Sequence, residues 1–226
     1  KLSRKLELIA RKSALTPPIV FADFGQRRRH SFLWQEYAIG MARDMLGPQF
    51  TGTSNTWMAF HHDLVPVGTN AHELPMVLTA LAETDEAKWN AQHDVLQQWH
   101  GMYGDGLRII LPDTYGSEQF FATSKIPAWL AEWRGMRQDS GDPVQAGERY
   151  IAWLKKNGAD PTQKVIIFSD GLDVDEMMRL SQHFSGKIKV AFGWGTLFTN
   201  DFLDCHPNPF MRGRFRPFSM VCKVVS

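Results

Sequence analysis

The stretch KVIIFSDGLDVDEMMRLSQHF, residues 164–184, decides the fold class. It begins with a short apolar run that ends in Ser-Asp-Gly, which is typical of a buried parallel strand. The segment continues with Asp173 and Glu176, which resemble a capping box with Asp at the cap and predict a helix over 173–184. A buried strand followed at once by a helix is the repeating unit of α/β proteins.

The same alternation of apolar runs and helical stretches continues along the chain, without an internal repeat or a low-complexity linker. Besides 164–170, strands are predicted at 19–25, 49–54, 65–69, 108–114, 134–140, 189–195 and 218–225. Further helices are predicted at 31–46, 83–103 and 142–157, the last with Asp142 as its cap and Pro143 at its first position. Up to eight strands in one series favour an irregular (β/α) TIM-like barrel over an open sheet.

The two ends of the sequence predict a piece of a longer barrel protein. The chain begins with KLSRKLELIARKSAL, which reads as a helix already under way, and it closes on the β-branched run SMVCKVVS. We therefore expect residues 1–226 to form one barrel domain, with 1–18 as the end of a helix that comes from a largely missing N-terminal domain. Some functional residues would then lie outside this chain.

The composition excludes several classes of protein. Of the 226 residues, 43% are hydrophobic, which suffices for a full core and argues against disorder. The formal net charge of +1 gives no reason to expect a nucleic-acid partner, and no apolar run is long enough to span a membrane. Cys205 and Cys222 lack zinc-binding spacing, so ordinary thiols in a reducing cytoplasm are the simplest expectation.

Polar residues of unusual type follow the predicted strands instead of being scattered. The segments that hold them are 24–27, 52–55, 68–73, 112–114, 137–141, 169–171 and 193–196. In a barrel the carboxyl ends of the strands face the same side, where such enzymes place their active sites. The segments therefore predict one site on that face.

Three carboxylates in these segments suit a ligand that carries hydroxyl groups. Asp113, Asp139 and Asp170 each follow a predicted strand. Their oxygens could bind sugar hydroxyls or Mg²⁺, and their charge could stabilise a positive charge that develops on a substrate.

Other residues in the segments suit an anionic, phosphorylated ligand. Arg27 and Arg137 offer planar forks that match a carboxylate or a phosphate. Gly193 and Gly195 allow backbone N–H groups to approach a phosphate closely. His72 stands beside a carboxylate in the sequence and could act as a base or as a phosphoryl acceptor.

Several residues have a purely structural interpretation. Asp142 and Asp173 are expected to be helix N-caps. His61 and His62 would point apart on a helix, so a metal site is not expected there. The basic run that begins at Arg27 can also be the solvated start of a helix. Four tryptophans are expected to pack in a core or an interface, namely Trp89, Trp99, Trp129 and Trp133.

The motifs resemble those of one known family. FADFGQRRRHS, GTSNTWMA, PVGTNAHE, LPDTYG, RQDSGDP, FSDGLDVDE and FGWGTLFTND are similar, in order and spacing, to the motif series of nicotinate phosphoribosyltransferases. The resemblance covers essentially the whole chain, and RQDSGDP together with AHE is its most specific part. More distant relatives that use nicotinamide carry similar but altered versions.

The resemblance implies a type II phosphoribosyltransferase, whose irregular barrel is joined to an α/β domain built mainly from the N-terminal part. It implies that nicotinate condenses with 5-phosphoribosyl-1-pyrophosphate (PRPP) to give nicotinate mononucleotide and pyrophosphate, a glycosyltransferase step of NAD salvage. ATP is implied as a co-substrate, consumed as in a ligase through a phosphorylated histidine, and Mg²⁺ accompanies the pyrophosphate. A cytoplasmic homodimer with a shared active site is implied as well. An aromatic residue that reaches the pyridine across the dimer interface would belong to the missing N-terminal part, so this piece alone is expected to be nearly inactive.

The resemblance also implies a role for each matching residue. His72, in the AHE motif, would be the phosphorylated residue. Asp113 and Asp139 would hold ribose hydroxyls and stabilise the transition state. The substrate-binding residues would be Phe24 on the pyridine ring, Arg27 and Arg137 near the pyridine or the phosphates, Thr53, Ser54 and Ser140 in their motifs, Asp170 and Gly171 at the ribose, and Gly193, Gly195 and Thr196 at the 5′-phosphate. No metal ligand is singled out.

Ser54 favours nicotinate over nicotinamide as the substrate. In the relatives that use nicotinamide, an Asp occupies this place in the similar motif. An anionic acceptor suits an amide donor and repels a carboxylate, and a neutral Ser54 removes that repulsion.

Three alternatives remain open. A phosphoribosyltransferase for nicotinamide or quinolinate would use the same loops. A metal-dependent barrel hydrolase could use His72 and the strand-end Asp residues, but the sequence lacks an HxH pair after the first strand. The third is an inactive fragment that only binds a ligand or a partner. The basic segment 206–218 matches no motif of the family. Its charge could serve ATP or phosphate binding, but a solvated surface loop is the first expectation.

Overall fold

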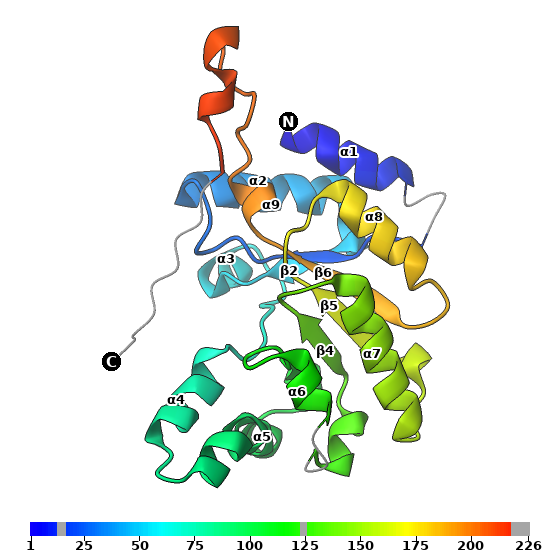
Figure 1. Ribbon diagram of the computed structural model, residues 1–226. Helices are drawn as coiled ribbons and strands as arrows, with labels where there is room; N and C mark the ends of the chain where they lie inside the picture. The colour runs from blue at the N-terminus through cyan, green and yellow to red at the C-terminus, as the bar shows by residue number, and fades with distance from the viewer. Residues whose placement is uncertain (13–16, 123–125, 218–226) are drawn as a thin grey trace. The chain divides into compact units, whose positions relative to one another are not determined.

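The computed structural model describes residues 1–12, 17–122 and 126–217 (Figure 1). These residues divide into two compact units. Unit 1 comprises Lys1–Val67, Gly171–Gln182 and Ala191–Ser226, and unit 2 comprises Gly68–Asp170 and His183–Val190. Among the helices of the described ranges, none has the length and apolar character needed to cross a membrane.

Unit 1 is built on three parallel strands in the order β2-β1-β6. These are β1 (Phe21–Asp23), β2 (Phe50–Thr53) and β6 (Lys189–Trp194), whose first two residues belong to unit 2. Phe21 of β1 pairs in register with both neighbouring strands. The register between β1 and β2 shifts before Asp23, where Gly52 of β2 adopts a φ of +139° that favours glycine.

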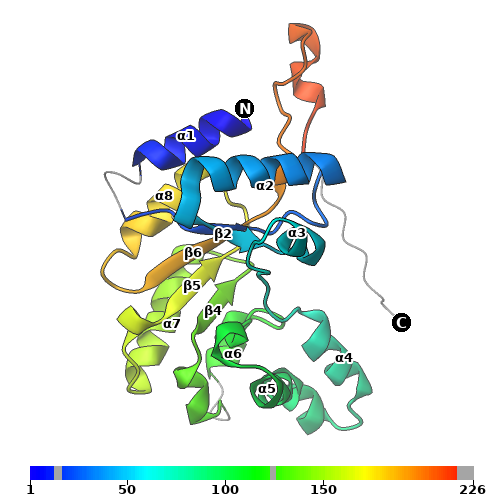
Figure 2. The same cartoon turned by 180° about the vertical axis from the view of Figure 1, so that it is seen from behind.

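Helices surround the strands of unit 1. Their bounds are α1 (Leu2–Lys12), α2 (Phe32–Leu46), α3 (Thr56–His61), α8 (Val174–His183) and α9 (Thr196–Thr199). Side chains cap three of them, since Ser31, Asn55 and Asp173 accept hydrogen bonds from the backbone at the starts of α2, α3 and α8. Figures 1 and 2 show α1 lying beside α2 from both sides.

Aromatic rings form the core of unit 1. Phe21 contacts Phe50, Trp194 and Phe198 edge to face, with ring centroids 5.4–5.6 Å apart. Edge-to-face packing of this kind contributes beyond the burial of area alone. The core therefore fixes β1 against both of its neighbours and places the residues after each strand.

Unit 2 repeats the plan with parallel strands in the order β3-β4-β5. These are β3 (Ile109–Ile110), β4 (Gly135–Gln138) and β5 (Val165–Phe168). The helices are α4 (Glu73–Leu81), α5 (Asp85–Met102), α6 (Ser117–Ala122) and α7 (Pro143–Lys156), and α4 and α5 pack against each other as a hairpin (Figure 2). Thr84 caps α5 and Asp142 caps α7 through the side chain.

The expected α/β fold is confirmed, with parallel strands and surrounding helices. Six of the eight predicted strands are present, within one to four residues of the expected bounds. The prediction for 65–69 is wrong, because only Pro66 forms a bridge to Thr53 and a proline has no N–H to continue a ladder. The predicted strand 218–225 lies outside the described residues. That residues 1–226 act as one barrel domain stays a prediction.

Candidate active site

The ends of the strands in unit 2 bring three predicted catalytic residues together. Asp113 follows β3 after two buried residues, Asp139 directly follows β4, and His72 directly precedes α4. Because neighbouring parallel strands end on the same edge of a sheet, the two carboxylates lie on that edge, and the start of α4 carries His72 to them.

His72 is held from both sides of its ring. Its Nδ1 lies 2.9 Å from the hydroxyl of Thr114, and its Nε2 lies 3.2 Å from Asp139 and 3.9 Å from Asp113. A carboxylate facing Nε2 favours the tautomer that carries its proton there, which leaves the lone pair on Nδ1 to accept from the Thr114 hydroxyl. A quarter of the side chain stays exposed, so a ligand can reach the ring.

Asp139 is surrounded by donors. Its Oδ1 lies 2.9 Å from the Arg137 guanidinium and accepts from the hydroxyl of Ser169 at 2.7 Å. Burial alone would raise the pKa of Asp139, but the hydrogen bond to His72, the charge of Arg137 and the Ser169 hydroxyl together lower it to about 2. Asp139 is therefore ionised at neutral pH. Its ionised form stabilises the fold above about pH 4, the range of an unfolded Asp, and this contribution is lost as the pH falls toward 2.

Asp113 has one occupied and one free oxygen. Its side chain is only 4% exposed, and its Oδ2 accepts a hydrogen bond of 2.5 Å from Ser140. Its buried Oδ1 has no hydrogen-bond partner among the residues that the structure describes. Buried carboxylate oxygens are nearly always paired, so this atom is suited to receive a donor or a cation from a ligand.

Asp113 and Asp139 could supply only part of the ligands of a Mg²⁺ ion. In the described ranges, no group of three or more His, Cys, Asp or Glu side chains is arranged to hold a metal ion. A resident metal centre, as a barrel hydrolase needs, is therefore not formed by these residues. Mg²⁺ commonly binds through one or two carboxylates and the phosphates of a substrate, and Asp113 with its free oxygen fits that mode.

The loop after β4 is shaped by Gln138 and by a glycine. The Gln138 amide donates to the carbonyl oxygens of Ser140 and Gly141 at 2.8 and 3.1 Å. Gly141 has a φ of +78°, which favours glycine. This loop conformation places Ser140 beside Asp113.

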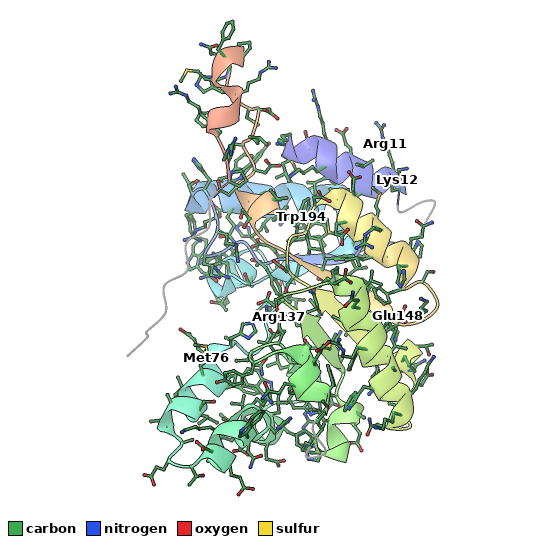
Figure 3. The ribbon with its side chains drawn as sticks, in the orientation of Figure 1. Arg11, Lys12, Met76, Arg137, Glu148 and Trp194 are labelled. Atoms are coloured by element: carbon green, nitrogen blue, oxygen red, sulfur yellow. The ribbon has the colours of Figure 1, made fainter. Side chains whose placement is uncertain are left out.

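Two further predicted site residues lie near the ends of β4 and β5. Arg137, labelled in Figure 3, lies next to the end of β4, whereas Asp170, after β5, is exposed.

In unit 1 the predicted pyridine-stacking residue lies against the predicted phosphate loop. A Cβ on Gly193 would come within 2.5 Å of the Phe24 ring, so the ring packs directly on the backbone of β6. The Phe24 N–H donates to the carbonyl of Trp194 at 3.0 Å, and a Cβ on Gly195 would lie 3.2 Å from the Phe24 carbonyl oxygen. Phe24, Gly193 and Gly195 therefore form one packed group.

The arginine that reaches this group is Arg28. Its guanidinium donates to the hydroxyl of Thr196 at 3.3 Å, whereas Arg27 is exposed to solvent. From the sequence, Arg27 and not Arg28 was the site residue predicted in this basic run. Only the direction in which each side chain points separates the two, and the sequence does not give it. The role expected for Arg27 stays a prediction.

Thr53 and Ser54 are held by a residue that sequence analysis missed. The Thr53 hydroxyl donates to the carboxylate of Asp23 at 2.7 Å, and the Ser54 N–H donates to the Asp23 carbonyl at 2.8 Å. Asp23 is fully buried, and burial raises its pKa above the usual value despite the hydrogen bonds that lower it, the largest of which comes from Thr53. A charged residue inside an apolar strand was the available signal, since such residues are almost never fully buried without partners.

The structural interpretations of other residues are largely confirmed. Asp142 and Asp173 accept hydrogen bonds from the backbone at the starts of α7 and α8. His62 pairs with Glu36 at 2.8 Å, while the ring of His61 lies against Trp57. Among the four tryptophans Trp133 is buried, but Trp89 is 62% exposed and is not a core residue.

Comparison with known proteins identifies the family. The family model described as the nicotinate phosphoribosyltransferase (NAPRTase) family matches residues 19–225. The chain belongs to this family. The matched range includes every predicted site residue of both units.

Solved structures of the family agree with this assignment. A nicotinate phosphoribosyltransferase from Vibrio cholerae is 33% identical with a TM-score of 0.80, over 90% of this chain and 47% of that one. The enzyme of the same name from Porphyromonas gingivalis is 29% identical with a TM-score of 0.80, over 88% and 49%. Human nicotinic acid phosphoribosyltransferase, 21% identical with a TM-score of 0.51 over 85% and 46%, shares the fold. The chain thus spans about half the length of the structures that it matches.

Proposed function

We propose that the complete protein transfers the phosphoribosyl group of PRPP to nicotinate and couples this step to ATP hydrolysis through a phosphate on His72. The placement of His72 between the Thr114 hydroxyl and the Asp139 carboxylate carries the proposal. Membership of the nicotinate phosphoribosyltransferase family supports the choice of substrates. A cytoplasmic homodimer with a shared active site belongs to the same proposal.

The phosphoryl step uses the nitrogen of His72 that has a lone pair. The γ-phosphoryl group of ATP bonds to Nδ1 as its bond to ADP breaks, and water later releases it as phosphate. The ring gains positive charge when it is phosphorylated, and the ionised Asp139 at Nε2 stabilises that charge. The Thr114 hydroxyl must turn away from Nδ1 as the group arrives.

The transfer step forms a bond between the ring nitrogen of nicotinate and C1′ of the ribose while the bond from C1′ to pyrophosphate breaks. The sugar becomes cationic on the way. Asp113 and Asp139 supply negative charge that does not need to reorient, which lowers the barrier. Mg²⁺, when bound with the substrate, would neutralise charge on the leaving pyrophosphate.

A coupled assay of the complete protein tests this function. Nicotinate, nicotinamide and quinolinate are each supplied with PRPP, with and without ATP, and the mononucleotide products are measured. We expect synthesis from nicotinate that ATP stimulates. Turnover of quinolinate or nicotinamide in place of nicotinate would reassign the substrate, and equal rates with and without ATP would remove the coupling.

Introducing a carboxylate at Ser54 should reverse the substrate preference. In Ser54→Asp, like charges disfavour nicotinate, so its kcat/KM should fall by at least about a hundredfold relative to nicotinamide. Ser54→Ala is the matched control, because it removes the hydroxyl without adding charge and should keep the preference for nicotinate. An unchanged ratio of the two substrates in Ser54→Asp would show that position 54 does not face the pyridine substituent.

Removing the hydroxyl of Thr114 should slow the phosphorylation of His72. In Thr114→Val the ring loses the contact that orients it before the phosphoryl group arrives, and no hydroxyl can turn to donate to an oxygen of that group. The loss of one such hydrogen bond in the transition state corresponds to a rate lower by about tenfold. The measurement is the initial rate at which acid-labile phosphate appears from labelled ATP. Thr162→Val is the control, since the hydrogen bonds of its hydroxyl within the described part of the chain are to Asp160 and Gln163 of the same exposed turn. An unchanged rate would mean that Asp139 alone orients the ring.

A further inference from the structure

Asp23 is a carboxylate enclosed at the end of β1 and held by three donors. Its side chain is 0% exposed. Its Oδ1 accepts from the N–H of Gly25 at 2.7 Å, and its Oδ2 accepts from Gln35 at 2.6 Å and from Thr53 at 2.7 Å. A carboxylate in such a place is costly unless each oxygen is paired, so these contacts define one geometry.

Two of the three donors adjoin the predicted pyridine-binding residues. Gly25 directly follows Phe24, and Thr53 directly precedes Ser54. The carbonyl oxygen of Asp23 accepts from the Ser54 N–H, which ties the segment of Thr53 and Ser54 a second time. Asp23 thereby sets the position of Ser54 relative to Phe24.

Gln35 on α2 extends the contacts to a third element. While its amide donates to Asp23, its carbonyl oxygen accepts from Arg29 at 2.9 Å and from Asn55 at 3.2 Å. The Arg29 guanidinium also acts electrostatically on Asp23. A helix, two strand ends and the start of α3 are therefore joined through two buried side chains, Asp23 and Gln35.

We propose that Asp23 is a positioning residue for nicotinate, fixing the distance between the Phe24 ring and Ser54. The role rests on the proposed function. The Phe24 ring packs directly on Gly193, which leaves no space on that side, and the residues on either side of Phe24 are joined by the hydrogen bond from Gly25 to Asp23. A shift of the chain at Phe24 changes the fit to the pyridine and leaves the unit 2 contacts of His72 in place.

Asp23→Asn in the complete protein tests this role. Asn keeps the shape of Asp, but its NH₂ group replaces one carboxylate oxygen and therefore faces donors. Depending on the orientation of the amide, these donors are Gly25 or the pair Gln35 and Thr53. We expect the KM for nicotinate to rise by about tenfold to a hundredfold, because one or more buried hydrogen bonds are lost. The kcat should change far less. The rate of acid-labile phosphate formation from ATP should stay at the unaltered level. Asp44→Asn is the matched control, because Asp44 is an exposed carboxylate that pairs with its exposed neighbour Arg43.

A compensating change separates positioning from bulk stability. In the double variant Asp23→Asn with Gln35→Glu, the new amide donates to the new carboxylate, which can still accept from Arg29 and Asn55. We expect most of the loss in KM to be recovered. Gln35→Met removes the donor to Asp23 together with the acceptor for Arg29 and Asn55. It should raise the KM several-fold, and it decides the question should Asp23→Asn fail to fold.

The outcomes distinguish this inference from the proposed function. If the unaltered protein makes no nicotinate mononucleotide, the proposed function fails and the role of Asp23 falls with it. If the unaltered protein is active but Asp23→Asn and Gln35→Met keep its KM, the positioning role alone is wrong. Equal losses of nicotinate use and His72 phosphorylation in a folded variant would also overturn it, because they would show a general distortion.

Discussion

Replacing His72 with alanine is expected to remove all stimulation of nicotinate mononucleotide synthesis by ATP. His72, Asp113 and Asp139 form the acidic cluster of unit 2, in which His72 offers a nucleophilic nitrogen. Thr114 contacts one nitrogen of its ring and Asp139 contacts the other. Alanine has no acceptor for the phosphoryl group, so the rate with ATP should fall to the rate without it. The measurement compares both rates and the amount of acid-labile phosphate on the protein.

The matched control for this variant is His62→Ala. His62 belongs to unit 1 and pairs there with Glu36 on α2. This control should keep both the stimulation and the labelled phosphate. If His72→Ala still carries acid-labile phosphate, another residue is the acceptor, and the interpretation of the acidic cluster must change.

The acidic cluster shows what the sequence could and could not provide. His72, Asp113 and Asp139 stood out because each follows or precedes a predicted element. Thr114 did not, because its importance depends on a contact with a residue 42 positions away. Long-range pairing of this kind is a property of the folded sheet and leaves no local pattern.

The helices also differ in how well the sequence predicts them. Local chemistry specified α7 well, since Asp142 caps it and Pro143 occupies its first turn, and both act within one turn of the chain. Helix α4 was not predicted. Its sequence ELPMVLTAL is apolar on most sides and lacks the polar face that identifies a surface helix, with Val77 and Leu81 both exposed. Its contacts with α5, which are tertiary, decide that it forms.

Gly193 illustrates a residue whose type was recognised but whose neighbour was not. Glycine at this position predicted that a phosphate approaches the backbone, and the family resemblance implied that it is the 5′-phosphate. In the structure its Cα faces the ring of Phe24 at a distance that excludes a Cβ. The absence of a side chain therefore has a second physical reason, which is the packing of an aromatic ring on β6.

Gly193→Ala is expected to weaken nicotinate binding strongly. The added methyl group would lie 2.5–2.8 Å from three atoms of the Phe24 ring, so the ring must move. Overpacking of a close contact costs about 1–3 kcal/mol, which corresponds to a KM for nicotinate raised by about tenfold to a hundredfold. The control is Gly40→Ala in α2, where a Cβ meets no described atom within 4 Å outside the nearby backbone of its own helix. This variant should keep the KM for nicotinate.

The two roles of Gly193 make opposite predictions for the second substrate. If its main part is to hold Phe24, the KM for nicotinate rises and that for PRPP changes little. If a phosphate lies on its backbone, the KM for PRPP rises at least as much, because the methyl group blocks the approach of the phosphate. Measuring both constants in one variant separates stacking from phosphate binding, and a change in PRPP alone would contradict the stacking role.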